Sequence, residues 1–164
     1  MNVNLSMNQF KDDYLVRNIE KTLKETEVPP EKIAIELTES TFSDDKEETI
    51  TKLHQLKTLG FCIAIDDFGT GYSSLGYILD FPVDSIKIDR SFIRVLNENK
   101  KIEAIVSAIN TMANTMDISV VAEGIETEEQ FKTVQQLKCN VAQGYLFDRP
   151  LSKEEVERKW LVKQ

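Results

Sequence analysis

The chain has 164 residues, of which 41% are hydrophobic, with a formal net charge of −8 and a pI near 4.8. That length and composition suit one globular domain with a core of its own. The negative charge argues against a nucleic-acid-binding surface, because too few basic residues remain to neutralise a polyphosphate backbone. A small phosphate ligand stays open, since bound divalent cations would reverse the local field.

Cysteine content and hydropathy narrow the class of protein further. Cys62 and Cys139 are too few and too far apart in sequence for a disulfide scaffold or a zinc site, so we expect free buried thiols in a reducing cytosol. No apolar run approaches the roughly 20 residues of a membrane helix, and the N-terminus MNVNLSMNQF lacks the basic and apolar regions of a signal peptide. The sequence therefore predicts a cytoplasmic protein without a membrane segment.

Histidine chemistry has little support in this chain. His54 is the only histidine, and it lies in a polar-apolar alternation that predicts a surface helix. Serine or cysteine triads with a histidine base, and metal sites built on several histidines, are therefore excluded. Any hydrolytic chemistry must use carboxylates, lysine and metal.

Short β-like runs alternate with longer helical patterns along the whole chain. The strands are expected at 3–5, 33–37, 62–66, 85–88, 119–122 and 141–142, and apolar residues recur at helical spacing over 15–23, 50–59, 102–112 and 131–137. Gly60 is expected to close one helix, and Thr127 with Gln130, like Ser152 with Glu155, has the spacing of a capping box. Alternating β and α units predict a parallel sheet with crossovers, either open or closed into a barrel.

The placement of polar residues favours the barrel. Residues at or just beyond the carboxyl ends of different strands are Glu36, Asp66, Asp67, Lys87, Glu123 and Gln143. A TIM barrel collects catalytic groups on that face from many strands, whereas a doubly wound sheet concentrates them at one switch point. Six strand candidates fall short of the eight of a complete barrel. We therefore expect an α/β fold: an incomplete (β/α) TIM-type barrel of about six mainly parallel strands.

The segment 63–92 carries the strongest chemical signal. An apolar run ends in the adjacent aspartates Asp66 and Asp67, a turn with two glycines follows, and the next strand carries Lys87 and Asp89. Adjacent carboxylates at a strand end repel each other unless a cation or a proton lies between them. This arrangement predicts a site for metal ions and phosphate.

Five motifs occur in order along the chain. They are ELTES at 36–40, DDFGTGYSSL at 66–75, KIDRSF at 87–92, AEGIET at 122–127 and QGYLF at 143–147. Together they closely resemble the EAL domain family of bacterial cyclic di-GMP phosphodiesterases, from Asn4 to about Pro150. The resemblance implies a modified TIM barrel that hydrolyses cyclic di-GMP to the linear dinucleotide with two Mg²⁺ or Mn²⁺ ions, in bacterial second-messenger signalling.

The resemblance also implies roles for individual residues, motif by motif. The metal ligands would be Asn4, Glu36, Asp66, Asp67 and Glu123, with Asp66 bridging the two ions. Lys87 would hold the nucleophilic water, and Glu123 would assist as base or ligand. Glu39 would anchor the loop at 66–75, while Glu126 and Gln143 would complete the outer shell and the substrate contacts.

One departure from the family pattern bears on activity. The Glu-Ala-Leu motif that names the family lies upstream of the NVNLS segment in complete domains, and this sequence contains none. The resemblance thus implies a single partial EAL domain over 1–164, corresponding to the C-terminal two-thirds and lacking the N-terminal strand-helix units. We expect this chain alone to be weak or inactive, and to form a homodimer or larger species.

Three classes of function remain in competition. The first is an EAL-type phosphodiesterase, favoured because the two-aspartate and AEG segments keep their carboxylates. The second is a degenerate EAL module that binds cyclic di-GMP or a protein partner without catalysis. The third is a metal-dependent lyase or an enolase-like barrel, which also has Asp, Glu and Lys at strand ends but does not account for the ordered motif set.

Overall fold

A curled parallel sheet organises the chain. The computed structural model describes residues 1–38, 41, 46–70 and 75–161, and within these ranges six strands form one sheet in the order β1 to β6, every neighbouring pair parallel. The strands are β1 (Asn2–Asn4), β2 (Ala34–Thr38), β3 (Cys62–Phe68), β4 (Ser85–Ile88), β5 (Ser119–Glu123) and β6 (Val141–Gln143). The predicted incomplete TIM-type barrel is confirmed, with strand ends shifted by two residues or fewer.

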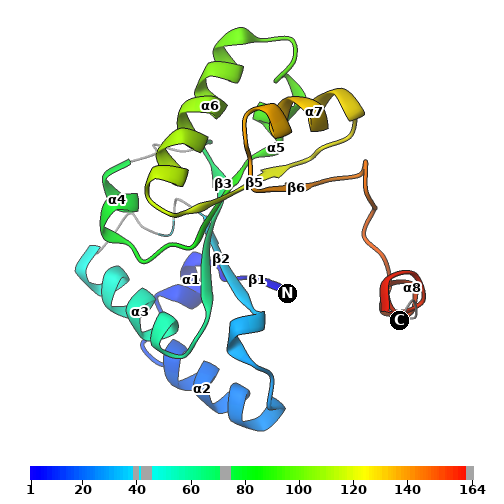
Figure 1. The fold of residues 1–164 in the computed structure, drawn as a ribbon. Helices are drawn as coiled ribbons and strands as arrows, with labels where there is room; N and C mark the ends of the chain where they lie inside the picture. Colours follow the sequence, from blue (N-terminus) through cyan, green and yellow to red (C-terminus); the bar gives the residue numbers. More distant parts are fainter. Residues whose placement is uncertain (39–40, 42–45, 71–74, 162–164) are drawn as a thin grey trace.

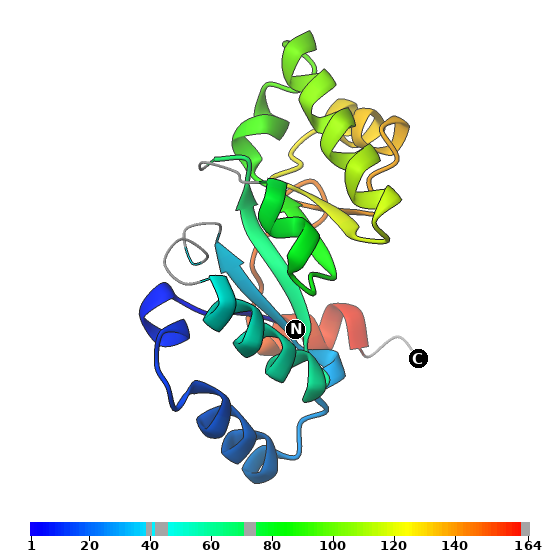
Figure 2. The same cartoon turned by 90° about the vertical axis from the view of Figure 1, so that its left-hand side faces the viewer.

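Helices connect successive strands and cover one side of the sheet, whereas the last helix, α8 (Lys153–Val156), follows β6 and lies apart (Figure 1). They are α1 (Met7–Phe10), α2 (Leu15–Thr26), the 3₁₀ turn η1 (Pro30–Lys32), α3 (Lys46–Thr58), α4 (Leu75–Asp80), α5 (Arg90–Arg94), α6 (Lys100–Thr115), α7 (Glu128–Gln136), α8 (Lys153–Val156) and the π-helical turn η3 (Glu157–Leu161). Figure 1 shows α3 and α4 on one side of β3, and α8 on the other side and apart from the sheet. Figure 2, turned by 90°, shows α3 and α4 in front of the strands.

Alternation along each strand separates the core from the site. Ile35 and Leu37 are buried in the hydrophobic core, as are Ile86 and Ile88, and a charged residue lies between each pair. Successive side chains of a strand point to opposite faces. Glu36 and Lys87 therefore project from the face opposite the helices, which is the inner face of the curled sheet.

The predicted helix ends are confirmed. Gly60 has φ +103°, a conformation that glycine adopts at little cost, and its N–H bonds to the carbonyl of Lys57 at 2.9 Å. Capping boxes begin α7 at Thr127 and α8 at Ser152. These local signals fix where each helix starts and stops, and so where the neighbouring strands present their carboxyl ends.

Three smaller predictions have mixed outcomes. His54 is exposed on α3, as expected. Cys62 and Cys139 are free, but they are half-buried rather than buried, because Cys62 begins β3 and Cys139 lies between α7 and β6 at the margin of the core. Among the described helices, none is long and apolar enough to cross a membrane.

Candidate functional site

Lys87 lies at the centre of a group of carboxylates on the inner face of the sheet. Its Nζ is 2.7 Å from Glu36 Oε1, 2.9 Å from Asp66 Oδ1 and 2.8 Å from Glu123 Oε1. These three acids come from β2, β3 and β5, and β4 carries the lysine between them. Parallel strands in sequence order thus bring residues distant in the chain to one point.

The ammonium of Lys87 is fully engaged by these contacts. Burial lowers the pKa of Lys87, but hydrogen bonds to Glu123, Glu36 and Asp66 raise it by more, so the pKa lies above its ordinary value. An ammonium has three N–H donors, and three carboxylates accept them. Lys87 is therefore a permanent cation at this site.

Glu36 is held from two sides. It is 4% exposed, and its Oε1 accepts a hydrogen bond from Asn2 Nδ2 at 2.6 Å in addition to the one from Lys87. Asn2 on β1 lies two residues before Asn4, so both side chains leave the same face of the strand. The sequence analysis selected Asn4 and missed Asn2, although period two along β1 could have indicated both.

Asp66 and Asp67 reach the same site although they are adjacent. Regular alternation would place them on opposite faces of β3. The register with β4 shifts between Ile65 and Phe68, and Asp67 has φ +52°, in the left-handed region that non-glycine residues rarely adopt. This irregularity turns Asp67 back toward the inner face, and such strain is typical of functional sites.

The turn after the two aspartates packs against a second motif. Gly69 has φ +95°, and a Cβ at this position would lie 2.9 Å from the ring of Phe92 in the KIDRSF segment. Only glycine fits this close approach without a shift of the ring. The DDFG and KIDRSF motifs are therefore parts of one packed unit that sets the direction of Asp66 and Asp67.

Three carboxylates form the candidate metal centre, called here the carboxylate cluster. Among the described residues, the cluster consists of Asp66, Asp67 and Glu123. Each offers one carboxylate oxygen, and these three oxygens lie within 4.8 Å of one another. Burial raises the pKa of Asp67, and the neighbouring charges of Asp66 and Asp89 raise it further. Burial also raises the pKa of Glu123, against the opposing effect of Lys87. An all-oxygen set short of positive charge fits a hard divalent cation.

A pocket of about 510 Å³ opens beside the cluster. It is lined by Asp67, Asp89, Arg90, Glu123, Gly124, Glu126, Gln143, Gly144 and Tyr145. The predicted residues Glu126 and Gln143 are thus brought next to two members of the cluster. The sequence analysis did not select Asp89, Arg90 and Tyr145 as site residues, although each lies within or next to a quoted motif.

Asp89, one of the residues that line this pocket, also caps a helix. It is the N-cap of α5, where its Oδ1 accepts a hydrogen bond from the N–H of Ser91 at 2.9 Å. Burial raises the pKa of Asp89, but hydrogen bonds from Ser91 and Arg90 lower it by more, so its pKa lies below the ordinary value. Asp89 therefore adds a stable negative charge beside Asp67.

Two of the predicted residues stand apart from these contacts. Asn4 is exposed on β1, in register with Glu36 on β2. It shares the edge of the site, but it is not part of the carboxylate cluster. Glu39 lies outside the residues that the structure describes.

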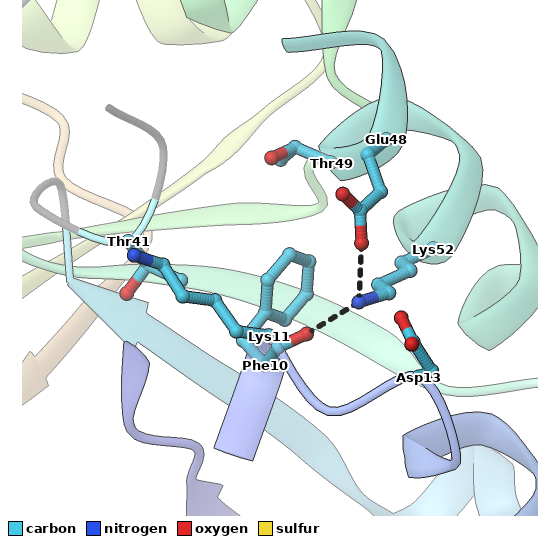
Figure 3. A pocket seen from close by; sticks show the side chains of 7 residues that line it. All are labelled: Phe10, Lys11, Asp13, Thr41, Glu48, Thr49 and Lys52. Carbon is cyan, nitrogen blue, oxygen red and sulfur yellow. Dashed lines mark hydrogen bonds and ion pairs between the residues drawn. The ribbon is translucent and has the colours of Figure 1, made fainter. Parts of the chain in front are cut away.

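A second pocket contains a lysine in a different setting. This pocket, of about 310 Å³, lies between α1 and α3 and is lined by Phe10, Lys11, Asp13, Thr41, Glu48, Thr49 and Lys52 (Figure 3). Lys52 Nζ donates to the carbonyl oxygen of Phe10 at 3.0 Å and pairs with Glu48 at 2.7 Å. Lys52 thereby joins two helices, and the pocket contains no member of the carboxylate cluster.

Known proteins with similar sequences share one domain type. The EAL domain family model matches residues 1–150. The chain is 42% identical over 154 residues to the bifunctional diguanylate cyclase/cyclic di-GMP phosphodiesterase MucR of Pseudomonas aeruginosa, and 35% identical over 156 residues to the cyclic di-GMP phosphodiesterase RocR of that organism. These alignments cover 94% and 93% of this chain, but only 22% and 40% of those two proteins.

Solved structures agree with the sequence matches. The PaMucR phosphodiesterase in complex with c-di-GMP has a TM-score of 0.89 at 42% identity, covering 94% of this chain and 63% of that chain. A manganese and cy-diGMP complex of BlrP1 from Klebsiella pneumoniae has a TM-score of 0.84 at 31% identity, covering 91% and 38% respectively. The chain thus spans less than two thirds of the length of these relatives.

Proposed function

This chain belongs to the EAL domain family, and from that premise we propose that its function is the metal-dependent hydrolysis of cyclic di-GMP to the linear dinucleotide. The observation that carries the proposal is the convergence of Asp66, Asp67 and Glu123 within 4.8 Å, next to Lys87. Relatives named as cyclic di-GMP phosphodiesterases, and similar structures with that nucleotide bound, support the choice of substrate.

The cofactor in this proposal is Mg²⁺ or Mn²⁺. Asp66, Asp67 and Glu123 would hold one ion, and Glu36 with Asn4 would contribute to a second ion that shares Asp66. Two divalent ions stabilise both the entering and the leaving oxygen of a phosphodiester and lower the pKa of bound water. The all-oxygen donors of this chain suit these hard cations.

Side chains of this protein would provide proton transfer, orientation of the attacking water and binding of the nucleotide. Glu123, which lies beside Lys87 in the carboxylate cluster, would assist as a base toward the attacking water or as a metal ligand. Lys87 would orient that water once one of its three carboxylate bonds is released. Arg90, Glu126 and Gln143 line the adjoining pocket and would bind the nucleotide there.

A second candidate function is binding without turnover. All three N–H donors of Lys87 are occupied by carboxylates, and the 164 residues contain no Glu-Ala-Leu run to complete the family's ligand set. Loss of a single electrostatic group in an active site costs roughly 10² to 10³ in rate. We therefore propose that turnover by this chain alone is very slow, and that it acts in that form as a module binding cyclic di-GMP or a protein partner.

Assembly and location form part of the same proposal. We propose a homodimer that forms either through α4, where Leu79 is exposed, or through the open edges of the sheet at β1 and β6. We expect the protein to act in the cytoplasm, with cyclic di-GMP as its ligand there. The net charge of −8 disfavours DNA or RNA as a partner.

The test separates the two candidates directly. The purified chain is incubated with cyclic di-GMP and Mn²⁺, and the linear product is measured by chromatography, while calorimetry measures nucleotide affinity. Mn²⁺-dependent product that is lost with EDTA and in Asp66→Asn plus Asp67→Asn supports phosphodiesterase activity. Nucleotide binding without product supports the binding module. Neither product nor nucleotide binding at saturating Mn²⁺ would contradict both the phosphodiesterase and the cyclic di-GMP-binding module.

A further inference from the structure

We infer that Lys87 is an internal counter-ion that holds the site's carboxylates together in the metal-free protein and competes with the divalent cation for them. This inference rests on the proposed metal site and adds a property that the site has before any metal binds. It assigns Lys87 a positioning role distinct from orienting water. The two roles alternate, because one ammonium cannot serve both sets of partners at once.

The geometry supports this inference in two ways. Lys87 Nζ lies within 2.9 Å of all three partner acids, so its donors are saturated. Two of those partners, Asp66 and Glu123, are also members of the carboxylate cluster. The ammonium therefore occupies part of the space and the lone pairs that a bound cation would use.

Burial makes the competition strong. The side chain of Lys87 is 7% exposed and that of Glu36 is 4% exposed, so water screens their charges poorly. Without Lys87, Glu36, Asp66 and Glu123 would face one another with no cation among them, and carboxylates in that position repel or take up protons. A divalent ion would relieve the same repulsion, since it supplies positive charge to the same oxygens.

Removal of the Lys87 ammonium should lower the stability of the metal-free protein and raise its affinity for a divalent metal. Removal of the ammonium destabilises the metal-free protein, because repulsion within the group is no longer offset. Removal also strengthens metal binding, because a competing cation and its charge repulsion toward the metal are gone. A merely structural lysine would behave differently, since its loss would disorder the ligands and weaken metal binding.

The experiment compares Lys87→Met with the parent chain and with Lys57→Met. Lys57 is a suitable control because its Nζ pairs with Asp84 at 2.6 Å at the start of β4, away from the carboxylate cluster. Thermal unfolding is recorded in EDTA and in saturating Mn²⁺, and Mn²⁺ affinity is measured by calorimetry. None of these readouts depends on catalysis.

We expect Lys87→Met to have a lower Tm than the parent in EDTA, a Mn²⁺-induced rise in Tm at least twice that of the parent, and a Kd for Mn²⁺ at least threefold lower. Lys57→Met is expected to lower Tm equally in both conditions and to leave the Kd unchanged. A Lys87→Met protein with the parent's Mn²⁺-induced shift, or with weaker Mn²⁺ binding, would overturn the inference.

Two further outcomes are decisive. If Lys87→Met is unfolded in EDTA, recovery of the fold on addition of Mn²⁺ supports the inference, whereas failure to recover while Lys87→Arg folds contradicts it. If the parent chain itself binds no Mn²⁺, the proposed metal site fails. Parent binding combined with weaker binding by Lys87→Met rejects only the counter-ion role.

Discussion

Two buried lysines, Lys52 and Lys87, have opposite electrostatic surroundings. Among the residues that the structure describes, Lys52 Nζ contacts the carboxylate of Glu48 and the carbonyl oxygen of Phe10, and it lies 5.8 Å from the centre of the Phe10 ring. Lys87 contacts three carboxylates, and a fourth, Asp67, lies among the same acids. Lys52 is balanced by the charge of Glu48. Lys87, in contrast, has more carboxylates around it than its single positive charge can neutralise.

The contrast separates a structural lysine from one in a functional site. Lys52 connects α3 to the end of α1 across 42 positions of sequence, and its ion pair with Glu48 and its hydrogen bond to Phe10 offset the cost of its burial. At Lys87 the acids exceed the cation, and the pKa values of Asp67 and Glu123 are raised. A surplus of carboxylates around one buried lysine is costly unless a ligand offsets it, so the surplus marks the site.

The largest effect on Mn²⁺ binding is expected when the two aspartates of the carboxylate cluster lose their charge. Asp66→Asn combined with Asp67→Asn should abolish Mn²⁺ binding and any Mn²⁺-dependent hydrolysis, because two of the three charged ligands of the cluster become neutral amides. Isothermal calorimetry measures the binding. Asp12→Asn plus Asp13→Asn, on the segment after α1, is the matched control. Unchanged Mn²⁺ affinity in the site variant would show that the cluster is not the metal centre.

The next effect concerns catalysis at Lys87. Lys87→Gln keeps a hydrogen-bond donor but removes the charge, and should lower any measurable turnover by roughly 10² to 10³. The chromatographic assay for the linear dinucleotide measures the change in kcat. A loss of less than about tenfold would mean that the ammonium contributes little to the transition state.

A moderate effect on stability alone is expected at Lys52. Lys52→Met should lower the free energy of unfolding by about 1 to 3 kcal/mol, because the Phe10 carbonyl and Glu48 lose a buried partner. Mn²⁺ affinity should stay the same. Urea unfolding with parallel calorimetry tests both statements. A changed Mn²⁺ affinity would contradict the separation of the two lysines.

The smallest effect is expected at Asn2. Asn2→Ala removes one of the hydrogen bonds that fix Glu36 Oε1, a loss worth about 0.5 to 1.5 kcal/mol. The Kd for Mn²⁺ should rise by roughly twofold to tenfold, and Tm should fall by only a few degrees, since Asn2 is exposed on an edge strand. Lys87 still holds Glu36 in this variant. A large fall in Tm without a change in Kd would assign Asn2 a purely structural role.

Much of the fold could be predicted because its signals are local. Strand and helix periods, the glycine after α3 and the capping boxes each depend on a few neighbouring residues, and their order dictates a parallel sheet. The same reasoning placed Glu36, Lys87 and Glu123 at strand ends. The parallel register then brought them together, so part of the site was predictable from the chain alone.

The remaining features depend on distant contacts. The turn of Asp67 toward the inner face results from a shift in register between β3 and β4, which no single segment specifies. The bond from Asn2 to Glu36 joins residues 34 positions apart. The saturation of Lys87 by three acids likewise requires four strands in position.

Anomalous X-ray diffraction from crystals grown with Mn²⁺ is the sharpest test of whether the carboxylate cluster binds a divalent metal. We expect an anomalous peak bonded to oxygens of Asp66, Asp67 and Glu123, at about 2.0 to 2.6 Å, the range of hard divalent cations. A peak is not expected beside Lys52. Fully occupied manganese elsewhere, with Lys87 still bonded to all three acids at saturating Mn²⁺, would show that the carboxylate cluster is not the metal centre.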